Sequence, residues 1–495
     1  MSFNIILSET HFRRLRRKKV KKLKKYCKIG KLFIKKLFIF HKKYVIINIT
    51  NYSEKGVNDL AENFESVVID RIIINGGRKL NGEVYIEGMK NAALPIIFAT
   101  VLTRGKCVIE NLPSVSDVTL SLQILSEMGA SVKHLAPNTV EIDTKNFRYG
   151  TAPYDLVGKM RASTYLLGAE IGRFGKAKVG WPGGCDFGVR PIDLHIKGFE
   201  ALGAKVSIES GYINANADKG LIGNQIYFDV ASVGATVNVM LASVCAEGMT
   251  VIENAAREPH IVDLANFFNT CGANITGAGT SVIKIRGVKK LHGCTYTIIP
   301  DMIEAGTFMV AAAATGGKVT IKNVIPKHME TVSTKLAEMG CAIEEYDDAI
   351  TVISNGRLEG VTIKTLPYPG FPTDMHPQFS AALCFADGIS VISEGIWENR
   401  FRYTDELRKM GANITVEGKT ATITGGFKMT GARMKAVDLR GGAAVLIAAL
   451  AAEGTSEITG IEIIERGYHD IVGKLEKLGA NIKKDRFYAP AAKAN

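Results

Sequence analysis

The octet LEKLGANI (Leu475–Ile482) is the last of six copies of one short pattern, and these copies decide the fold. Each copy has two apolar residues three positions apart, then a glycine and a small residue. This is typical of a helix that ends at a positive φ and leads into a strand. The other five copies are LSEMGASV (Leu125–Val132), FEALGAKV (Phe199–Val206), FNTCGANI (Phe268–Ile275), LAEMGCAI (Leu336–Ile343) and LRKMGANI (Leu407–Ile414).

The glycines of the six octets are 68 to 74 residues apart. This regular spacing predicts six copies of one α/β unit of about seventy residues. Such a unit is longer than the units of most solenoid proteins, so we expect closed domains rather than an open array.

A short strand and a loop precede the helix of each unit, and five of the six loops bring a cation. Backbone N–H groups and the positive end of the helix dipole already favour anions at such a place. Any one of these cations could be a solvated loop charge, but their recurrence favours a shared site for anions. The five cations are Arg190, Arg257, Lys327, Arg400 and Arg466.

The formal charge of +13 comes from the N-terminal tail. Residues 1–50 hold 16 lysines or arginines and a single acid, Glu9, which is +15, so the rest of the chain carries −2. We expect residues 1–66 to be a basic, disordered extension, because such charge runs rarely form a packed core. The alternative is a basic amphipathic segment that lies on an anionic membrane surface.

The composition of the whole chain, with 46% hydrophobic and 22% charged residues, is ordinary for a soluble globular protein, which we expect to be cytoplasmic. The eight cysteines are scattered without a CxxC pair, which favours reduced thiols. No apolar run is long enough to span a bilayer. The nine histidines show no metal-ligand spacing, and no phosphate-binding or dinucleotide-binding glycine motif is complete, so we expect neither a metal site nor nucleotide hydrolysis.

Two segments carry candidate chemistry. In WPGGCDFGVRPIDLH (Trp181–His195), glycines surround Cys185, which lies five residues before Arg190; a nearby cation and a helix N-terminus would favour the thiolate. In FPTDMHPQ (Phe371–Gln378), Asp374 lies between prolines and could act as a general base. Considered alone, the first could be an inert cysteine in a glycine turn and the second a turn-capping aspartate.

Together these segments resemble the UDP-N-acetylglucosamine 1-carboxyvinyltransferase family of enolpyruvyl transferases. The resemblance runs from about Asp70 to about Lys483. It is carried, in order, by KNAALP (Lys90–Pro95), MRAS (Met160–Ser163), the GGCxxGxRPIDLH segment, SVGAT (Ser232–Thr236), ENAAREP, FPTDM, ENR (Glu398–Arg400), DLR (Asp438–Arg440) and ERGY (Glu465–Tyr468).

The resemblance implies an α/β fold, a two-domain inside-out α/β barrel of six βαβαββ repeats with three in each domain. It places residues 70–89 and 300–485 in one domain and residues 90–299, with the cysteine loop, in the other. The substrates would lie in the cleft between the domains.

The implied reaction adds the 3′-hydroxyl of UDP-N-acetylglucosamine to phosphoenolpyruvate and then eliminates phosphate, the first committed step of peptidoglycan precursor synthesis. It needs no metal or redox cofactor. Cys185 would be the general acid, and the thiol that fosfomycin alkylates, and Asp374 the second catalytic residue. The resemblance assigns phosphoenolpyruvate to Lys90, Asn91, Arg190, Arg400, Arg440 and Arg466. It assigns the sugar nucleotide to Asn91, Arg161, Arg190, Pro191, Ile192, Asp193, Leu194, Ser232, Val233, Gly234, Asp374 and Ile396.

Three positions depart from the family pattern, namely Met89, Val230 and Met302, and none removes an assigned catalytic group. Three rival hypotheses remain open from the sequence. One is the sister enzyme that acts on shikimate 3-phosphate, which lacks the GGC loop. The second is a nucleic-acid-binding protein, suggested only by the tail, and the third is a duplicate copy of the enzyme with reduced activity.

Overall fold

The computed structural model describes residues 2–8, 33–40, 44–50, 66–183 and 192–490. The chain divides into two compact units, residues 70–485 and a smaller unit formed by residues 1–69 and 486–495. Within the smaller unit, three described strands pair as an antiparallel sheet in the order β1-β3-β2. They are β1 (Ser2–Ser8), β2 (Phe33–Phe40) and β3 (Tyr44–Thr50). The expectation of a disordered tail did not include these strands, and for the rest of residues 1–66 it stays a prediction.

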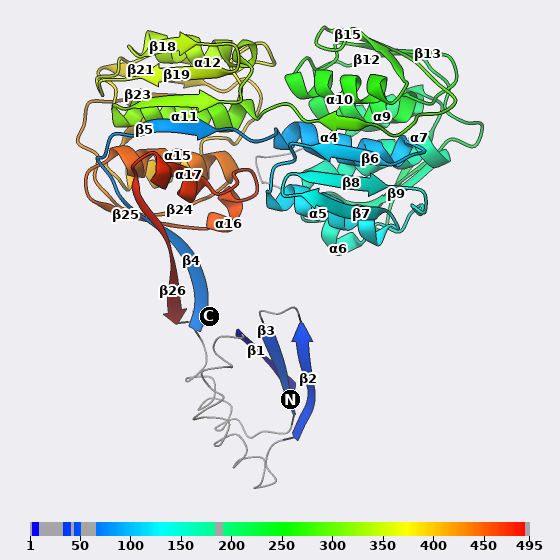
Figure 1. Ribbon diagram of the computed structural model, residues 1–495, viewed down its shortest axis with the longest axis horizontal. Coiled ribbons are helices and arrows are strands. Elements are labelled where there is room, and N and C mark those ends of the chain that lie inside the picture. The colour runs from blue at the N-terminus through cyan, green and yellow to red at the C-terminus, as the bar shows by residue number, and fades with distance from the viewer. Residues whose placement is uncertain (1, 9–32, 41–43, 51–65, 184–191, 491–495) are drawn as a thin grey trace. The chain divides into compact units, whose positions relative to one another are not determined.

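The larger unit contains six sheets in two groups of three, which we call the first and the second lobe (Figure 1). The sheets of the first lobe run β16-β6-β8-β7, β10-β11-β9 and β12-β13-β15-β14. Their strands are β6 (Cys107–Glu110), β7 (Ser131–Ala136), β8 (Thr139–Asp143), β9 (Lys176–Gly180), β10 (Lys205–Glu209), β11 (Tyr212–Asn216), β12 (Gln225–Tyr227), β13 (Met249–Glu253), β14 (Asn274–Thr276), β15 (Val282–Arg286) and β16 (Thr295–Thr297).

The sheets of the second lobe run β18-β19-β17-β5, β20-β21-β23-β22 and β24-β25-β4-β26. Their strands are β4 (Ser66–Asn75), β5 (Asn81–Tyr85), β17 (Lys318–Lys322), β18 (Ala342–Glu345), β19 (Ala349–Ile353), β20 (Thr362–Lys364), β21 (Ile389–Ser393), β22 (Asn413–Glu417), β23 (Thr420–Thr424), β24 (Arg433–Lys435), β25 (Thr455–Thr459) and β26 (Asn481–Pro490).

Three almost entirely buried helices pack against one another inside each lobe, and the sheets surround them. Ala, Val, Ile and Leu dominate these inner helices, as expected for helices that are apolar on all sides. The inner helices are α4 (Lys90–Ala99), α7 (Tyr165–Phe174) and α9 (Val233–Ser243) in the first lobe, and α11 (Met302–Thr315), α13 (His376–Leu383) and α15 (Leu439–Ala451) in the second. The α/β fold of repeated units predicted from the sequence, with helices inside and three units in each half, is confirmed.

The outer helices bury one face and end at the octets. They are α5 (Ser116–Glu127), α8 (Asp193–Ala201), α10 (Pro259–Thr270), α12 (Pro326–Glu338), α14 (Thr404–Arg408) and α17 (Ile471–Lys477); short helical turns are η1 (Thr100–Leu102), α6 (Tyr154–Val157), η2 (Arg161–Thr164) and α16 (Ile461–Ile464). The six octet glycines have φ between 91° and 100°, which confirms the predicted turn at each helix end. None of the helices in the described residues has the length and apolar character needed to cross a membrane.

The second lobe includes two strands, β4 and β5, that precede the first lobe in the chain. β5 precedes the first lobe in the chain but pairs in parallel with β17 of the second lobe, whereas β16 pairs in parallel with β6 of the first. Hydrogen bonds also join the two connecting segments, because Met89 N donates to Ile299 O at 2.7 Å. The exact domain boundaries expected from the sequence stay predictions.

Two of the octet glycines allow a matched test of the helix ends. Gly203 has φ +93° and a Cβ there would meet nothing within 4 Å, whereas a Cβ at Gly129, with φ +100°, would lie 2.5 Å from the Asn146 carbonyl oxygen. We expect Gly203→Ala to lower the free energy of unfolding by about 1 kcal/mol through backbone strain alone. Gly129→Ala should cost clearly more. Urea unfolding followed by circular dichroism measures both, and equal losses would contradict this account.

Candidate active site

Lys90 and Arg466 share one buried carboxylate, that of Asp117. Lys90 Nζ lies 3.2 Å from Asp117 Oδ2, and Arg466 Nε donates to Asp117 Oδ1 at 3.0 Å. Lys90 opens α4 and Asp117 lies in the first turn of α5, both in the first lobe, whereas Arg466 follows α16 in the second. Because Asp117 is 5% exposed, its charge is compensated by the two cations rather than by water. This bridge joins the two lobes.

Arg400 and Arg440 share a second carboxylate, that of Asp374. Arg400 Nη2 donates to Asp374 Oδ1 at 2.8 Å, and Arg440 Nε donates to Asp374 Oδ2 at 3.1 Å. The two arginine side chains are 2% and 3% exposed and that of Asp374 is 28% exposed. Burial alone would raise the pKa of Asp374, but the charges of Arg440 and Arg400 hold it well below its usual range. Asp374 is therefore ionised and faces solvent from between two buried cations.

Tyr468 and Asp301 connect these two groups. The Arg440 guanidinium lies over the Tyr468 ring, 5.3 Å from its centroid, and Tyr468 is two residues from Arg466. Asp301 caps α11, because its Oδ1 accepts a hydrogen bond from Ile303 N at 2.8 Å, and its Oδ2 accepts one from Lys90 N at 3.3 Å. Its negative charge is also one of those that raise the pKa of Arg440. Although Arg440 is paired, its Nη1 is buried without a hydrogen-bond partner among the described residues.

Glu394 orders the two loops beside Asp374. Its Oε1 accepts bonds from Ile396 N at 2.7 Å and Trp397 N at 3.0 Å, and its Oε2 accepts the Thr373 hydroxyl at 2.8 Å. His376 Nε2 lies 3.2 Å from Glu394 Oε2, but the angles of this contact are not those of a hydrogen bond. Burial and the Arg400 charge lower the pKa of His376 well below its usual value, so this contact joins a neutral ring to the carboxylate. Ile396 and Asp374 are thus brought to one place.

The expected nucleotide residues of the first lobe lie at the N-termini of α8 and α9 and on η2, elements that contact one another. Ser232 caps α9, where its hydroxyl accepts a bond from Ala235 N at 3.3 Å. His195 Nδ1 lies 2.8 Å from Asn238 Nδ2, and burial, followed by the Arg161 charge, lowers the pKa of His195 to about 4. The structure therefore brings together Arg161, Ile192, Asp193, Leu194, Ser232, Val233 and Gly234.

Three of the predicted site residues, Cys185, Arg190 and Pro191, lie outside the described residues. Asn91 is half-buried next to Lys90 at the start of α4. Lys327, one of the recurring loop cations, does not join the buried groups, because its side chain is 75% exposed and pairs with Glu330 at 2.5 Å. For this residue the alternative of a solvated loop charge is correct.

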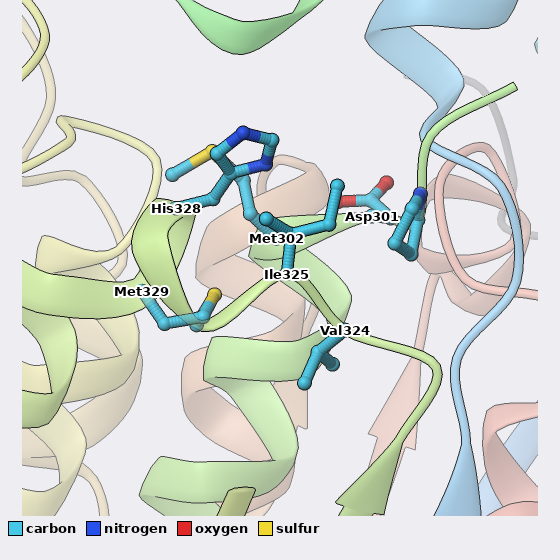
Figure 2. A pocket seen from close by; sticks show the side chains of 7 residues that line it. Asp301, Met302, Val324, Ile325, His328 and Met329 are labelled. Atoms are coloured by element: carbon cyan, nitrogen blue, oxygen red, sulfur yellow. The ribbon is translucent and has the colours of Figure 1, made fainter. Parts of the chain in front are cut away.

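A small hollow lies beside Asp301, at the connection between the lobes (Figure 2). Its wall includes Met302 from the start of α11, and Ile325 and His328 from the start of α12. Met302 departs from the family pattern, and it is 6% exposed. The methionine is therefore part of the buried packing next to Asp301.

Three residues of this region, Asp117, Asp301 and His260, were not predicted from the sequence. Asp117 follows the one loop of the six that brings no cation, and its position in the first turn of a helix could have marked it as a partner for one. His260 is buried in α10, and burial lowers its pKa to about 4 although the Asp374 carboxylate opposes the shift. No pattern in the sequence indicated that this histidine of the first lobe lies near Asp374.

Residues 74–475 match the family described as EPSP synthase (3-phosphoshikimate 1-carboxyvinyltransferase). A relative from Clostridium acetobutylicum, named UDP-N-acetylglucosamine 1-carboxyvinyltransferase 2, is 58% identical over 419 residues, 84% of this chain and 100% of the relative. A relative from Clostridium botulinum, named UDP-N-acetylglucosamine 1-carboxyvinyltransferase, is 56% identical over 415 residues, 84% of this chain and 99% of the relative.

Solved structures agree with this match. The enolpyruvyl transferase NikO from Streptomyces tendae superposes with a TM-score of 0.77 at 25% identity, covering 86% of this chain and all of that one. An EPSP synthase from Acinetobacter baumannii, with a TM-score of 0.66 at 20% identity over 84% of this chain and all of that one, shares the fold. Fold and site thus define an enolpyruvyl transferase, a class of enzymes that act on small molecules. The chain belongs to the UDP-N-acetylglucosamine 1-carboxyvinyltransferase family, as its motifs predicted.

The Asp374 cluster predicts a particular pH dependence of stability. Removing the carboxylate in Asp374→Asn leaves two buried arginines poorly compensated, so at pH 7 we expect a loss of about 3 kcal/mol. The folded pKa of Asp374 is depressed, so its contribution is present above the unfolded pKa of about 4 and is lost as the pH falls below it. The difference between variant and wild type should therefore narrow below pH 4. Urea unfolding measures it, with the exposed Asp387→Asn as the control; a difference independent of pH would contradict the prediction.

Proposed function

We propose that this protein transfers the enolpyruvyl group of phosphoenolpyruvate to the 3′-hydroxyl of UDP-N-acetylglucosamine, with release of phosphate, by addition and elimination. This is the first committed step of peptidoglycan precursor synthesis. The names of relatives that cover 84% of the chain support it. The observation that carries it is the meeting of Lys90, Arg400, Arg440 and Arg466 around the carboxylates of Asp117 and Asp374.

Phosphoenolpyruvate brings a carboxylate and a phosphate, which need several cations in one place. Arginine forks bind such planar or branched anions through two parallel hydrogen bonds. The unsatisfied Nη1 of Arg440 supports an anion at this point, because a buried charged donor without a partner costs free energy. In our proposal, Arg190 and Asn91 complete this site.

The nucleotide site would use the N-termini of α8 and α9. Free backbone N–H groups and two helix dipoles favour a diphosphate there, and Arg161 adds a formal charge. His195 adds none, because its low pKa keeps the ring neutral at pH 7. Asp374 and Ile396 in the second lobe would receive the sugar, so that the acceptor hydroxyl meets the enolpyruvyl carbon beside the four cations.

In the proposed mechanism Asp374 takes the proton of the 3′-hydroxyl while the oxygen bonds to C2 of phosphoenolpyruvate, and the thiol of Cys185 gives a proton to C3. Elimination then removes a proton from C3, restores the C2–C3 double bond and breaks the C–O bond to phosphate. The depressed pKa of Asp374 makes it a weak base in the free enzyme. Once substrate anions bind to Arg400 and Arg440 and compensate part of their positive charge, the pKa of Asp374 rises and it becomes a better base.

We also propose that the enzyme acts in the cytoplasm. The described cysteines, six of them, are free thiols, including Cys271 and Cys294, whose sulfur atoms are only 3.3 Å apart. Unbonded thiols at this distance fit a reducing compartment. The Cys185 thiol would make the enzyme a target of fosfomycin.

Phosphate release tests the proposed reaction. With the full chain we expect phosphate only when phosphoenolpyruvate and UDP-N-acetylglucosamine are both present, and none when shikimate 3-phosphate replaces the sugar nucleotide. Cys185→Ala should abolish or greatly lower the rate, whereas Cys185→Asp should stay active because a carboxyl can also donate a proton. Cys245→Ala, a free thiol away from the described site residues, is the control. Full activity of Cys185→Ala would refute the acid role, and activity on shikimate 3-phosphate would favour the sister reaction.

Arg440→Lys tests the anion site. Lysine keeps the charge but cannot contact Asp374 and a substrate anion with one rigid fork, so we expect kcat/KM to fall by about 100-fold. The matched control is Arg433→Lys, whose side chain is 85% exposed in the same lobe, and which should leave the rate unchanged. Steady-state phosphate release with each substrate varied in turn measures both variants. Equal rates in the two would remove Arg440 from the proposed site.

A further inference from the structure

Three cysteines that are far apart in the sequence meet in the first lobe. The sulfur atoms of Cys107, Cys271 and Cys294 all lie within 4.8 Å of one another, and those of Cys271 and Cys294 are 3.3 Å apart. Cys107 and Cys271 are buried and Cys294 is half-buried. Cys107 begins β6, whereas the loop that leads to Asp117 follows the other end of this strand. The cluster is therefore separate from the candidate active site.

Backbone hydrogen bonds hold the three cysteines in place. Val108 N donates to Cys294 O at 2.8 Å, and Val108 is paired with Thr295 in the parallel strands β6 and β16. Cys107 directly precedes Val108 and Cys294 directly precedes Thr295, so the two cysteines lie side by side at the start of these strands. Cys271 ends α10, and its carbonyl accepts a bond from His292 N at 2.9 Å. The three thiols thus come from three segments whose backbones are already fixed. Binding a ligand between them would require little reordering of the chain.

The internal repeat supplies a comparison for this cluster. The bond from His292 N to Cys271 O recurs as Ile222 N to Leu202 O, Glu359 N to Met339 O and Thr430 N to Met410 O, which identifies the equivalent positions. The positions equivalent to Cys107, Cys294 and Cys271, in that order, hold other residues in the four other four-stranded sheets. They hold Thr250, Asn224 and Leu202 in the sheet of β13, and Ser390, Val361 and Met339 in the sheet of β21. They hold Ser456, Ala432 and Met410 in the sheet of β25, and Val319, Gly82 and Leu478 in the sheet of β17. The fold itself therefore does not require a thiol at any of the three. Among these five four-stranded sheets, only that of β16 and β6 has cysteine at all three positions.

We propose that Cys107, Cys271 and Cys294 form a binding site for a thiophilic metal ion of the Zn²⁺ class, which none of the proposed catalytic steps uses. Zinc bonds to thiolate sulfur at about 2.3 Å, which places the sulfurs of a tetrahedral site about 3.8 Å apart, close to the spacing found here. The ion would displace the thiol protons on binding. The half-buried Cys294 gives access from solvent, and water would fill the fourth position.

A disulfide is the main alternative for such a cluster, but it would use only two of the thiols. It would not explain why the third position also holds a cysteine, unlike the equivalent position in the other copies of the unit. Three thiolates around one ion account for all three replacements. The expectation from the sequence that the chain holds no metal site rested on sequence spacing, and these cysteines are more than twenty residues apart even at their closest.

Cadmium titration tests this proposal, because Cd²⁺ binds the same ligands as Zn²⁺ and gives an ultraviolet charge-transfer band with thiolates. With the reduced full chain we expect a saturable band at one equivalent, which Zn²⁺ displaces. Cys294→Ser should weaken binding by about 100-fold or more, and so should Cys271→Ala. Cys245→Ser, which removes a thiol of the same lobe outside the cluster, should bind as the wild type does. Phosphate release should be unchanged in all three variants, so this test fails or succeeds independently of the proposed reaction.

Two results would overturn the proposal. One is cadmium binding that Cys294→Ser and Cys271→Ala leave unaltered, and the other is a Cys271–Cys294 disulfide found by peptide mass mapping of protein purified without reductant. Circular dichroism shows that each variant is folded, and Cys294→Ser, at a half-buried position, keeps the test valid if a buried variant does not fold.

Discussion

Burying a positive charge requires a negative partner, and in this enzyme two carboxylates meet that requirement for four cations. Asp117 compensates Lys90 and Arg466, and Asp374 compensates Arg400 and Arg440. Without these carboxylates, like charges would be brought together in a region with little water, at a cost of several kcal/mol for each ion. The arrangement of the proposed phosphoenolpyruvate site therefore depends on Asp117 and Asp374 before any substrate is present.

The same requirement links the two lobes. Arg466 belongs to the second lobe and Asp117 to the first, and Ser116 N, next to Asp117, also donates to Glu465 O at 3.4 Å. The two segments that connect the lobes are also joined to each other, because Met89 N, next to Lys90, donates to Ile299 O. A substrate anion that draws on Arg466 would weaken its bond to Asp117, so binding and the contact between the lobes are coupled through one side chain.

The fold could be predicted because the repeated octets describe local structure. A glycine that follows two apolar residues three positions apart indicates a helix end, and all six octet glycines have the positive φ that this predicts. The site could be predicted only in part, because it depends on which units face each other. Lys327 stands at an equivalent loop position to Arg466 but remains in solvent, and Asp117 belongs to the one unit whose loop has no cation. The cysteine cluster was missed for the same reason, since β16 pairs with β6 across almost two hundred residues of sequence.

The position of Asp374 between two arginines also explains how one carboxylate could serve two roles. In the free enzyme its charge offsets the repulsion between Arg400 and Arg440 and its oxygens hold their guanidinium groups in place, and their charges in turn hold its pKa low. An anion bound to the same guanidinium groups would take over part of this compensation. The carboxylate would then be left with less positive charge around it, and its affinity for a proton would rise. Asp374 would then stay unprotonated until the substrate anion is bound and would become a stronger base only at that point. Its activation would follow directly from the geometry of the ion pairs.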